Sequence, residues 1–148
     1  LSGRVNTLPA DAAILAVPAF RNESARAQAE QFVTFAVRDE FIRRSRLRLV
    51  ESPADADLLL EGKIAAFRTT PLSYSEAGAA NLYEVRLLLD VRLLDTRSGE
   101  ILFQGEAIAF RDTYETESGD FFSQESGALD RIAAKFAASV VSAILENF

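Results

Sequence analysis

The sequence predicts an α+β fold in which two helices pack on one face of a mixed, mostly antiparallel, four-stranded sheet with long hairpins. The first observation is the alternation of apolar and polar side chains in residues 82–94, which predicts a strand with one buried and one wetted face. The second is a helical spacing of apolar residues in two segments, 25–44 and 122–145. Elements with one apolar face each bury those faces against one another, and two layers are the simplest arrangement that does so.

The composition indicates a folded protein without the usual enzyme nucleophiles. Of its 148 residues 49% are hydrophobic and 26% charged, so we predict a single domain over residues 1–148. The absence of Cys and His excludes Ser-His-Asp and Cys-His catalysis and removes the usual zinc ligands. The net charge of -6 argues against a nucleic-acid-binding protein, because such proteins neutralise phosphates. We predict no cofactor and no metal.

The N-terminal third of the chain predicts a strand, the first helix and a short strand. Residues 13–20 are apolar but include Pro18, which has no N–H to donate, so we expect this strand at a sheet edge. Asn22 or Ser24 is a suitable cap for the helix. A short strand at residues 47–50 follows the helix. The apolar stripe of the helix comprises Ala29, Phe32, Val33, Ala36, Val37 and Phe41.

The remaining strands predict a meander. In the strand at residues 58–67, Gly62 predicts a bulge or the close approach of a helix. Residues 68–81 contain a proline and a run of small residues, so we expect them to form the tip of a long hairpin. The central strand then leads through a polar loop at residues 95–100 to a return strand at 101–110.

The last predicted helix has an apolar stripe of its own. Its polar face lacks the Lys and Arg that a membrane-surface helix carries, so we expect this helix to pack on the sheet. The stripe comprises Leu129, Ile132, Ala133, Phe136, Val140, Ile144 and Phe148.

Four arginines at the exit of the first helix form the first candidate site. They are Arg43, Arg44, Arg46 and Arg48. One interpretation is that cations stabilise the negative end of the helix dipole. The other is an anion site for a phosphorylated ligand. We favour the first, because such a terminal charge is worth ~0.3–1 kcal/mol without any ligand.

The predicted hairpin tip is the second candidate site, because exposed loop tips often carry function. A plain flexible turn is the alternative, and the sequence does not decide between the two. The candidate residues for binding a ligand or partner are Arg68, Thr69, Thr70, Pro71 and Tyr74.

The acidic segment at residues 111–120 suggests two further hypotheses. Calcium binding is one, but the segment lacks the Asp-x-Asp-x-Asp-Gly spacing, and acidic residues before a helix are favoured by its dipole anyway. A carboxylate hydrolase using Asp112 and Glu115 is the other. Retaining glycosidases need two carboxyls about 5–5.5 Å apart in a cleft, and nothing in the sequence points to such a cleft.

Four segments of the sequence form a recognisable series. They are Leu-Ser-Gly-Arg at 1–4 with Leu8-Pro9, Ile-Leu-Ala-Val-Pro-Ala-Phe-Arg-Asn-Glu-Ser at 14–24, Ala-Asp-Leu-Leu-Leu-Glu-Gly at 56–62, and Leu-Leu-Asp-Thr-Arg-Ser-Gly-Glu-Ile-Leu at 93–102. In order and spacing, over nearly the whole chain, these segments resemble the LptE family of lipopolysaccharide-assembly lipoproteins.

The resemblance implies a non-enzymatic lipoprotein on the periplasmic side of the outer membrane. Members of the family plug the lumen of the LptD β-barrel, help it assemble and can bind lipopolysaccharide. They are anchored through an acylated N-terminal Cys, which we expect just upstream of Leu1 because the sequence has none. Lipid A is phosphorylated. Screening confines exposed charges to ~8–10 Å, so Arg68 or the arginines at the helix exit can bind it locally despite the acidic balance.

A second hypothesis is a periplasmic scaffolding or activator module of the LpoB, CsgG and TolB N-terminal type. Those modules also begin with a strand of the form Ile-Ala-Val-x-x-Phe followed by Asn-x-Ser. The partner discriminates between the two hypotheses, because such a module binds a cell-wall synthase or a secretion pore.

Overall fold

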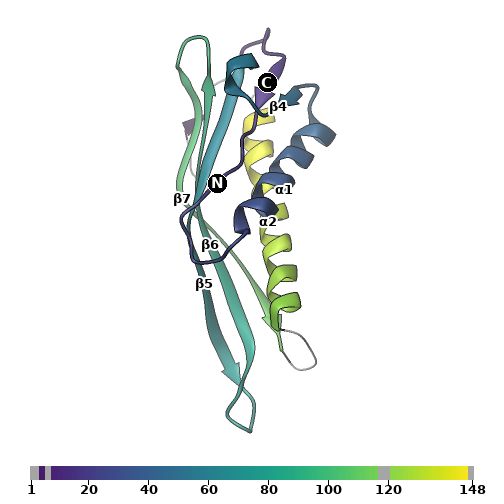
Figure 1. Ribbon diagram of the computed structural model, residues 1–148, viewed down its shortest axis with the longest axis vertical. Helices are drawn as coiled ribbons and strands as arrows, with labels where there is room; N and C mark the ends of the chain where they lie inside the picture. The colour runs from purple at the N-terminus through teal and green to yellow at the C-terminus, as the bar shows by residue number, and fades with distance from the viewer. Residues whose placement is uncertain (1–3, 6–7, 117–120, 147–148) are drawn as a thin grey trace.

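A computed structural model describes residues 4–5, 8–116 and 121–146 of the chain. Two helices and one mixed sheet form two layers, with both helices on the same face of the sheet (Figure 1). The elements are β1 Arg4–Val5, β2 Ile14–Ala16, β3 Arg21–Asn22, α1 Ala29–Arg44, β4 Arg48–Val50, the 3-10 helix η1 Pro53–Asp55, β5 Leu58–Tyr74, β6 Ala80–Asp95, β7 Ile101–Glu115 and α2 Phe121–Leu145. The predicted α+β class and its two layers are therefore confirmed.

Over the described residues the sheet has seven strands, and the prediction of four was too low. Its order is β1-β7-β6-β5-β2-β4, with β3 beside β5. The strands β5, β6 and β7 form the antiparallel meander, whereas β2 runs parallel to both β4 and β5. The strands that were missed, β1 and β3, have 2 residues each, which is too short for an alternation to show.

Only Ile14–Ala16 of the predicted first strand at residues 13–20 is a strand, as β2, and β3 follows beyond it at Arg21–Asn22. Its expected position at a sheet edge was wrong, because β2 lies between β5 and β4. Pro18 follows the end of β2, so its missing N–H costs no ladder hydrogen bond there.

The first helix starts four residues later than predicted, at Ala29, and neither expected residue caps it. Gln28 occupies the cap position at φ 68° without a side-chain hydrogen bond. Instead, Asn22 Oδ1 accepts a hydrogen bond from the N–H of Ser24 at 3.0 Å, and Ser24 Oγ accepts one from the N–H of Arg26 at 3.2 Å. These two side chains therefore stabilise the turn ahead of the helix.

The core lies between the helices and the sheet, and Phe136 of α2 stands at its centre. Its ring meets those of Phe20 and Phe110 edge-on, with centroids 6.0 Å and 5.8 Å away. The predicted α2 stripe is buried up to Ile144, while Phe148 lies outside the described residues. In β6 the predicted apolar side is also buried at Val85, Leu87, Leu89, Val91 and Leu93.

The hairpin of β5 and β6 is longer than predicted. Pairing continues to Tyr74 and Ala80, so only residues 75–79 form the turn, and the expected loop at 68–81 is mostly strand. Pro71 is tolerated because this half of β5 pairs with β6 alone. The end of the hairpin projects beyond both helices (Figure 1).

Gly62 allows a close approach, although by an aromatic ring rather than by a helix. A Cβ at this position would lie 2.5 Å from Phe20 Cε2 and 2.7 Å from the carbonyl oxygen of Asp90. The bulge in β5 comes slightly later, between Ile64 and Ala66. The absence of a side chain at Gly62 therefore lets the segment after β2 lie against the sheet.

Candidate functional site

Three arginines stand side by side on the face of the sheet that the helices leave uncovered, which we call the open face. The register places Arg68 of β5 opposite Arg86 of β6, and Arg86 opposite Arg111 of β7. The flanking residue Leu87 is buried under the helices, so Arg86 points to the opposite side. All three arginines are exposed. We call Arg68, Arg86 and Arg111 the arginine row.

The arginine row is poorly compensated by its own chain. Arg111 Nη1 lies 4.0 Å from Glu84 Oε2, at the outer limit of an ion pair. Within the part of the chain that the structure describes, Arg68 and Arg86 form no ion pair. Like charges directly opposite each other destabilise a sheet. The repulsion among the three arginines therefore destabilises this part of the sheet, and a bound anion from outside the chain would offset that destabilisation.

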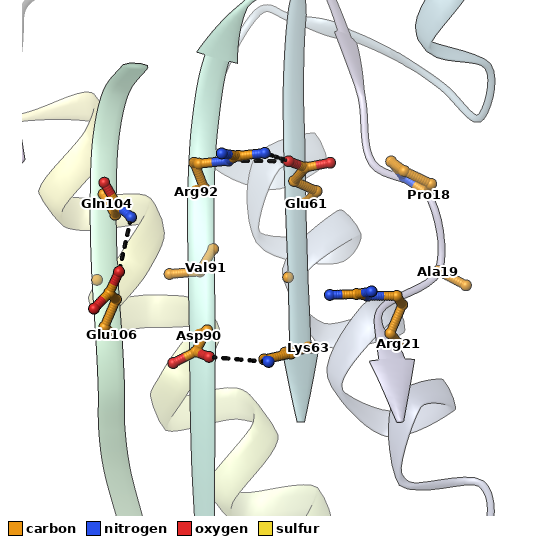
Figure 2. Close-up of a pocket in the computed structure, with 12 residues that line it drawn as sticks. Pro18, Ala19, Arg21, Glu61, Lys63, Asp90, Val91, Arg92, Gln104 and Glu106 are labelled. Atoms are coloured by element: carbon orange, nitrogen blue, oxygen red, sulfur yellow. Dashed lines mark hydrogen bonds and ion pairs between the residues drawn. The ribbon is translucent and has the colours of Figure 1, made fainter. Parts of the chain in front are cut away.

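Elsewhere on the open face, a hollow of about 660 Å³ lies where residues 18–21 pass beside β5 (Figure 2). Its charges compensate one another. Arg92 of β6 pairs with Glu61 of β5, and Lys63 Nζ lies 3.8 Å from Asp90 Oδ2 on the neighbouring strand. Figure 2 shows both pairs bridging adjacent strands. These paired charges hold β5 and β6 together and leave little net charge to recruit a ligand.

The predicted arginine cluster lies at the C-terminal end of α1, where a second hollow of about 800 Å³ opens. This hollow combines a basic rim with apolar walls. It is lined by Ala10, Ala12, Ala13, Arg43, Arg44, Ser45, Arg46, Leu47 and Leu145. Such a combination suits a ligand that is anionic at one end and apolar at the other.

The four arginines of this cluster differ in how they are engaged. Arg43 binds Asp39 at 2.9 Å and also pairs with Glu40. Arg44 donates to Glu40 Oε2 at 3.2 Å and to Ser142 Oγ at 2.9 Å, so it joins the two helices. Both side chains are therefore engaged by partners within the chain. Arg46 and Arg48 are exposed and form no ion pair among the described residues, which leaves them for an anion.

The hairpin candidates lie along the distal half of β5. Thr69 Oγ1 bonds Glu125 Oε2 at 3.3 Å, and Glu125 is also held by Arg26 at 3.0 Å, so this residue ties the hairpin to α2. Beside it, burial raises the pKa of Tyr114 to about 12. Thr70 and Pro71 are exposed, and Tyr74 at the end of the strand is 63% exposed.

The two predicted sets of residues are not brought together. The arginine cluster lies where α1 ends beside β4, and the hairpin projects from the other end of the long axis (Figure 1). A single small ligand therefore cannot bind both sets. If both sets are functional, they contact different molecules or distant parts of one large molecule.

The acidic segment at residues 111–120 is partly strand, and residues 117–120 lie outside the described residues. Asp112 faces α2, where its Oδ2 binds Arg131 at 2.8 Å. Burial alone would raise the pKa of Asp112, but the hydrogen bonds from Arg131 and the N–H of Thr113 outweigh it and lower this pKa. Glu115 is an odd number of residues further along β7, so it points to the other face. This pair therefore does not form the convergent site that the hydrolase hypothesis needs.

Arg86 and Arg111 are the residues that sequence reasoning missed. Each is visible as a polar position in an alternating strand. What brings them beside Arg68 is the register of two hairpins, which depends on the turn at residues 75–79 and on the bulges in β5 and β7. A count of residues between strands cannot supply those bulges.

Within the described ranges, no group of three or more acidic side chains could hold a metal ion. Of the helices in the same ranges, neither is both long and apolar enough to cross a bilayer.

The fold recurs in solved structures of bacterial proteins. PelC of Paraburkholderia phytofirmans, solved as a dodecamer, shares 16% identity at a TM-score of 0.65, over 97% of this chain and 96% of that one. Uncharacterized lipoprotein B from Nitrosomonas europaea shares 16% identity at a TM-score of 0.58, over 95% of this chain and 86% of that one. The rare lipoprotein B from Shewanella oneidensis shares 13% identity at a TM-score of 0.53, over 83% of this chain and 90% of that one. At these identities the likeness shows the fold alone. No curated protein matches the chain.

The family follows from the sequence as a whole. The family model described as LptE, lipopolysaccharide-assembly, matches residues 12–144, which includes β2, α1, all three long strands and α2 except its last residue. This match agrees with the resemblance carried by the segments at 14–24, 56–62 and 93–102. The chain therefore belongs to the LptE family of lipopolysaccharide-assembly proteins.

Proposed function

We propose that the chain is a non-enzymatic component of the outer-membrane lipopolysaccharide translocon that plugs an LptD-type β-barrel and assists its assembly. It acts on the periplasmic side of the outer membrane, anchored through a lipidated Cys upstream of Leu1, with residues 1–148 as one domain. Family membership supports the role in lipopolysaccharide assembly. The observation that carries the barrel-plug role is the shape, which is a two-layer body with one hairpin projecting from it (Figure 1).

The projecting hairpin suits a protein that inserts into a lumen. At ~3.3 Å per residue the 16 residues of β6 span roughly 50 Å, of which residues 80–84, roughly 15 Å, lie beyond the buried positions that begin at Val85. The end of the hairpin exposes Leu72 at 49% and Tyr74 at 63%. Large apolar side chains that a monomer leaves exposed are often contact residues in a complex. The hairpin end is therefore the part of the molecule best placed to meet the barrel wall.

Co-purification tests this function directly. We expect the tagged, lipidated chain to capture the LptD-type barrel encoded in the same genome from detergent-solubilised outer membranes. A variant with Leu72→Ser and Tyr74→Ser should capture less barrel, because it loses the apolar contact, while its melting temperature stays close to that of the parent. The matched control replaces the exposed apolar residues of α1, Phe35→Ser and Ile42→Ser, at the other layer of the molecule.

Two results would contradict this proposal. One is a tagged chain that returns no barrel. The other is a purified complex that contains only copies of the chain itself or a cell-wall synthase or secretion pore. The second result would favour the scaffolding alternative, for which the PelC-like fold provides the precedent of a dodecamer.

Lipopolysaccharide binding is the second part of the proposed function, and we assign it to the hollow lined by Arg46, with Arg48 two residues further along the chain. The basic rim fits phosphate groups and the apolar walls at Leu47 and Leu145 fit an acyl chain. The overall charge of -6 opposes long-range attraction of an anion, so the contact is local.

We expect the double variant Arg46→Glu, Arg48→Glu to bind lipopolysaccharide at least about tenfold more weakly, since charge-assisted hydrogen bonds are worth ~1.5–3 kcal/mol each. The measurement is a titration of the purified chain with lipopolysaccharide at fixed detergent and salt. The charge-matched control is Arg68→Glu, Arg86→Glu on the open face. Equal losses in both variants would mean that net charge alone governs binding, and an unchanged affinity in the first would exclude the hollow.

A further inference from the structure

We propose that the arginine row, Arg68, Arg86 and Arg111, is a docking site for carboxylates on the surface of a protein partner. This inference rests on the proposed function, because it takes that partner to be the wall of the β-barrel. It goes beyond that function by assigning the contact to one place on the open face and by naming the chemistry of the surface that the partner presents.

The first step is that the row needs an anion that the chain does not provide. Its members are Cα partners on three adjacent strands, so the three charges stand abreast. The acidic side chains closest to the row are already engaged, and Glu115 on the open face lies four residues beyond Arg111, roughly 13 Å along β7. Glu84 reaches only Arg111, at 4.0 Å. Asp112 is bound to Arg131 beneath the sheet.

The second step is that the surroundings of the row are flat. On the same face, the neighbouring row towards the body consists of Ala66, Leu88 and Ala109. The row towards the hairpin end consists of Thr70, Glu84 and Thr113. Neither of the two hollows described above is lined by a member of the arginine row. Small molecules bind in concave sites, whereas a flat face with long charged side chains fits a broad surface.

The third step is spacing. Adjacent strands lie about 4.8 Å apart, so the outer members of the row have their Cα atoms roughly 10 Å apart. Carboxylates on neighbouring strands of a partner sheet have the same spacing, because it is a property of β-structure. Arginine also binds carboxylates with two parallel hydrogen bonds, which fixes orientation as well as affinity. A barrel wall that carries acidic residues on two or three adjacent strands therefore matches the row.

The fourth step is position. Arg68 lies 6 residues before Tyr74, the last residue of β5, so at ~3.3 Å per residue the row stands roughly 20 Å from the hairpin end. If the hairpin end enters the lumen first, the row follows it inside. The row then fixes the depth and the rotation of the plug, because three charges abreast can face three carboxylates in one register only.

The test uses the complex of the lipidated chain with its LptD-type barrel. We expect the triple variant Arg68→Glu, Arg86→Glu, Arg111→Glu to bind the barrel at least about tenfold more weakly at 150 mM salt, because like charges at an interface oppose association. The triple Arg→Gln variant should bind with a weaker dependence on salt than the parent does. The variant Arg21→Glu, an exposed arginine that lines the charge-compensated hollow, is the control, and it should bind the barrel as the parent does.

The inference and the proposed function fail in different ways. If the parent chain forms no complex with the barrel, the proposed function is overturned and the inference with it. If the parent and the triple reversal bind equally well, only the inference is overturned. If the triple reversal loses affinity for lipopolysaccharide and keeps the barrel, the row serves a lipid head group and the inference is again overturned. Restored binding on changing the facing barrel carboxylates to Lys would confirm it.

Discussion

Replacing Phe136 by Ala is expected to lower the free energy of unfolding by about 3–5 kcal/mol. The side chain is fully buried and sits where three parts of the fold meet. Its ring contacts Phe110 of β7 and Phe20 of the segment after β2, with interplanar angles of 88° and 89°. Truncation at this position removes the apolar surface of the ring, two edge-to-face contacts and the support that this ring gives to its two aromatic neighbours.

Urea denaturation measures this effect, and Phe136→Leu is the matched control. Leu keeps most of the buried volume but neither aromatic contact, so its loss should be clearly smaller than that of Ala. A loss below about 1.5 kcal/mol for Phe136→Ala would mean that the site collapses around the truncated side chain, contrary to its central position in the core.

Replacing Gly62 by Ala is expected to cost about 1–3 kcal/mol or more through overpacking. The added Cβ would lie 2.7 Å from the carbonyl oxygen of Asp90, a backbone atom of β6 that cannot rotate away. It would also lie 2.5 Å from Phe20 Cε2, a buried ring that is itself packed against Phe136. The strands β5 and β6 or the segment after β2 must therefore shift.

Gly127 provides a control of opposite sign for the same substitution. It lies inside α2, and an added Cβ would meet Arg131 Nη1 at 3.5 Å, an ordinary contact. Ala is favoured over Gly in a helix by roughly 0.5–1 kcal/mol, so Gly127→Ala should stabilise the protein. Thermal unfolding of both variants would decide the matter, and a Gly62→Ala protein as stable as the parent would refute the close approach.

Much of the fold could be predicted because its long elements are strongly periodic. In β6 every second side chain from Val85 to Leu93 is buried, and α2 begins one residue before its predicted start at residue 122. Such regular patterns come from one face of each element being buried over its whole length. The local sequence of each element is therefore enough to predict that it exists and whether it is a helix or a strand.

The errors occurred where distant contacts override local preference. Residues 68–74 contain Pro71 and hydroxyl side chains, but pairing with β6 extends them as a strand. The start of α1, which was predicted too early, is an exception because the competing contacts there are local: Asn22 and Ser24 use their side-chain oxygens in the turn that precedes the helix. Arg86 and Arg111 could not be assigned to a site, because only the register across two hairpins places them beside Arg68.

The projecting end of the hairpin of β5 and β6 is held by fewer buried contacts than the rest of these strands. Residues 70–79 are almost all exposed, whereas the body of the same strands is clamped under two helices. Regions with few buried apolar contacts open locally at a much lower free energy than the whole molecule. The end that we propose enters the barrel can therefore bend, fray and re-pair against an irregular wall, while the helices keep the rest of the chain folded behind it.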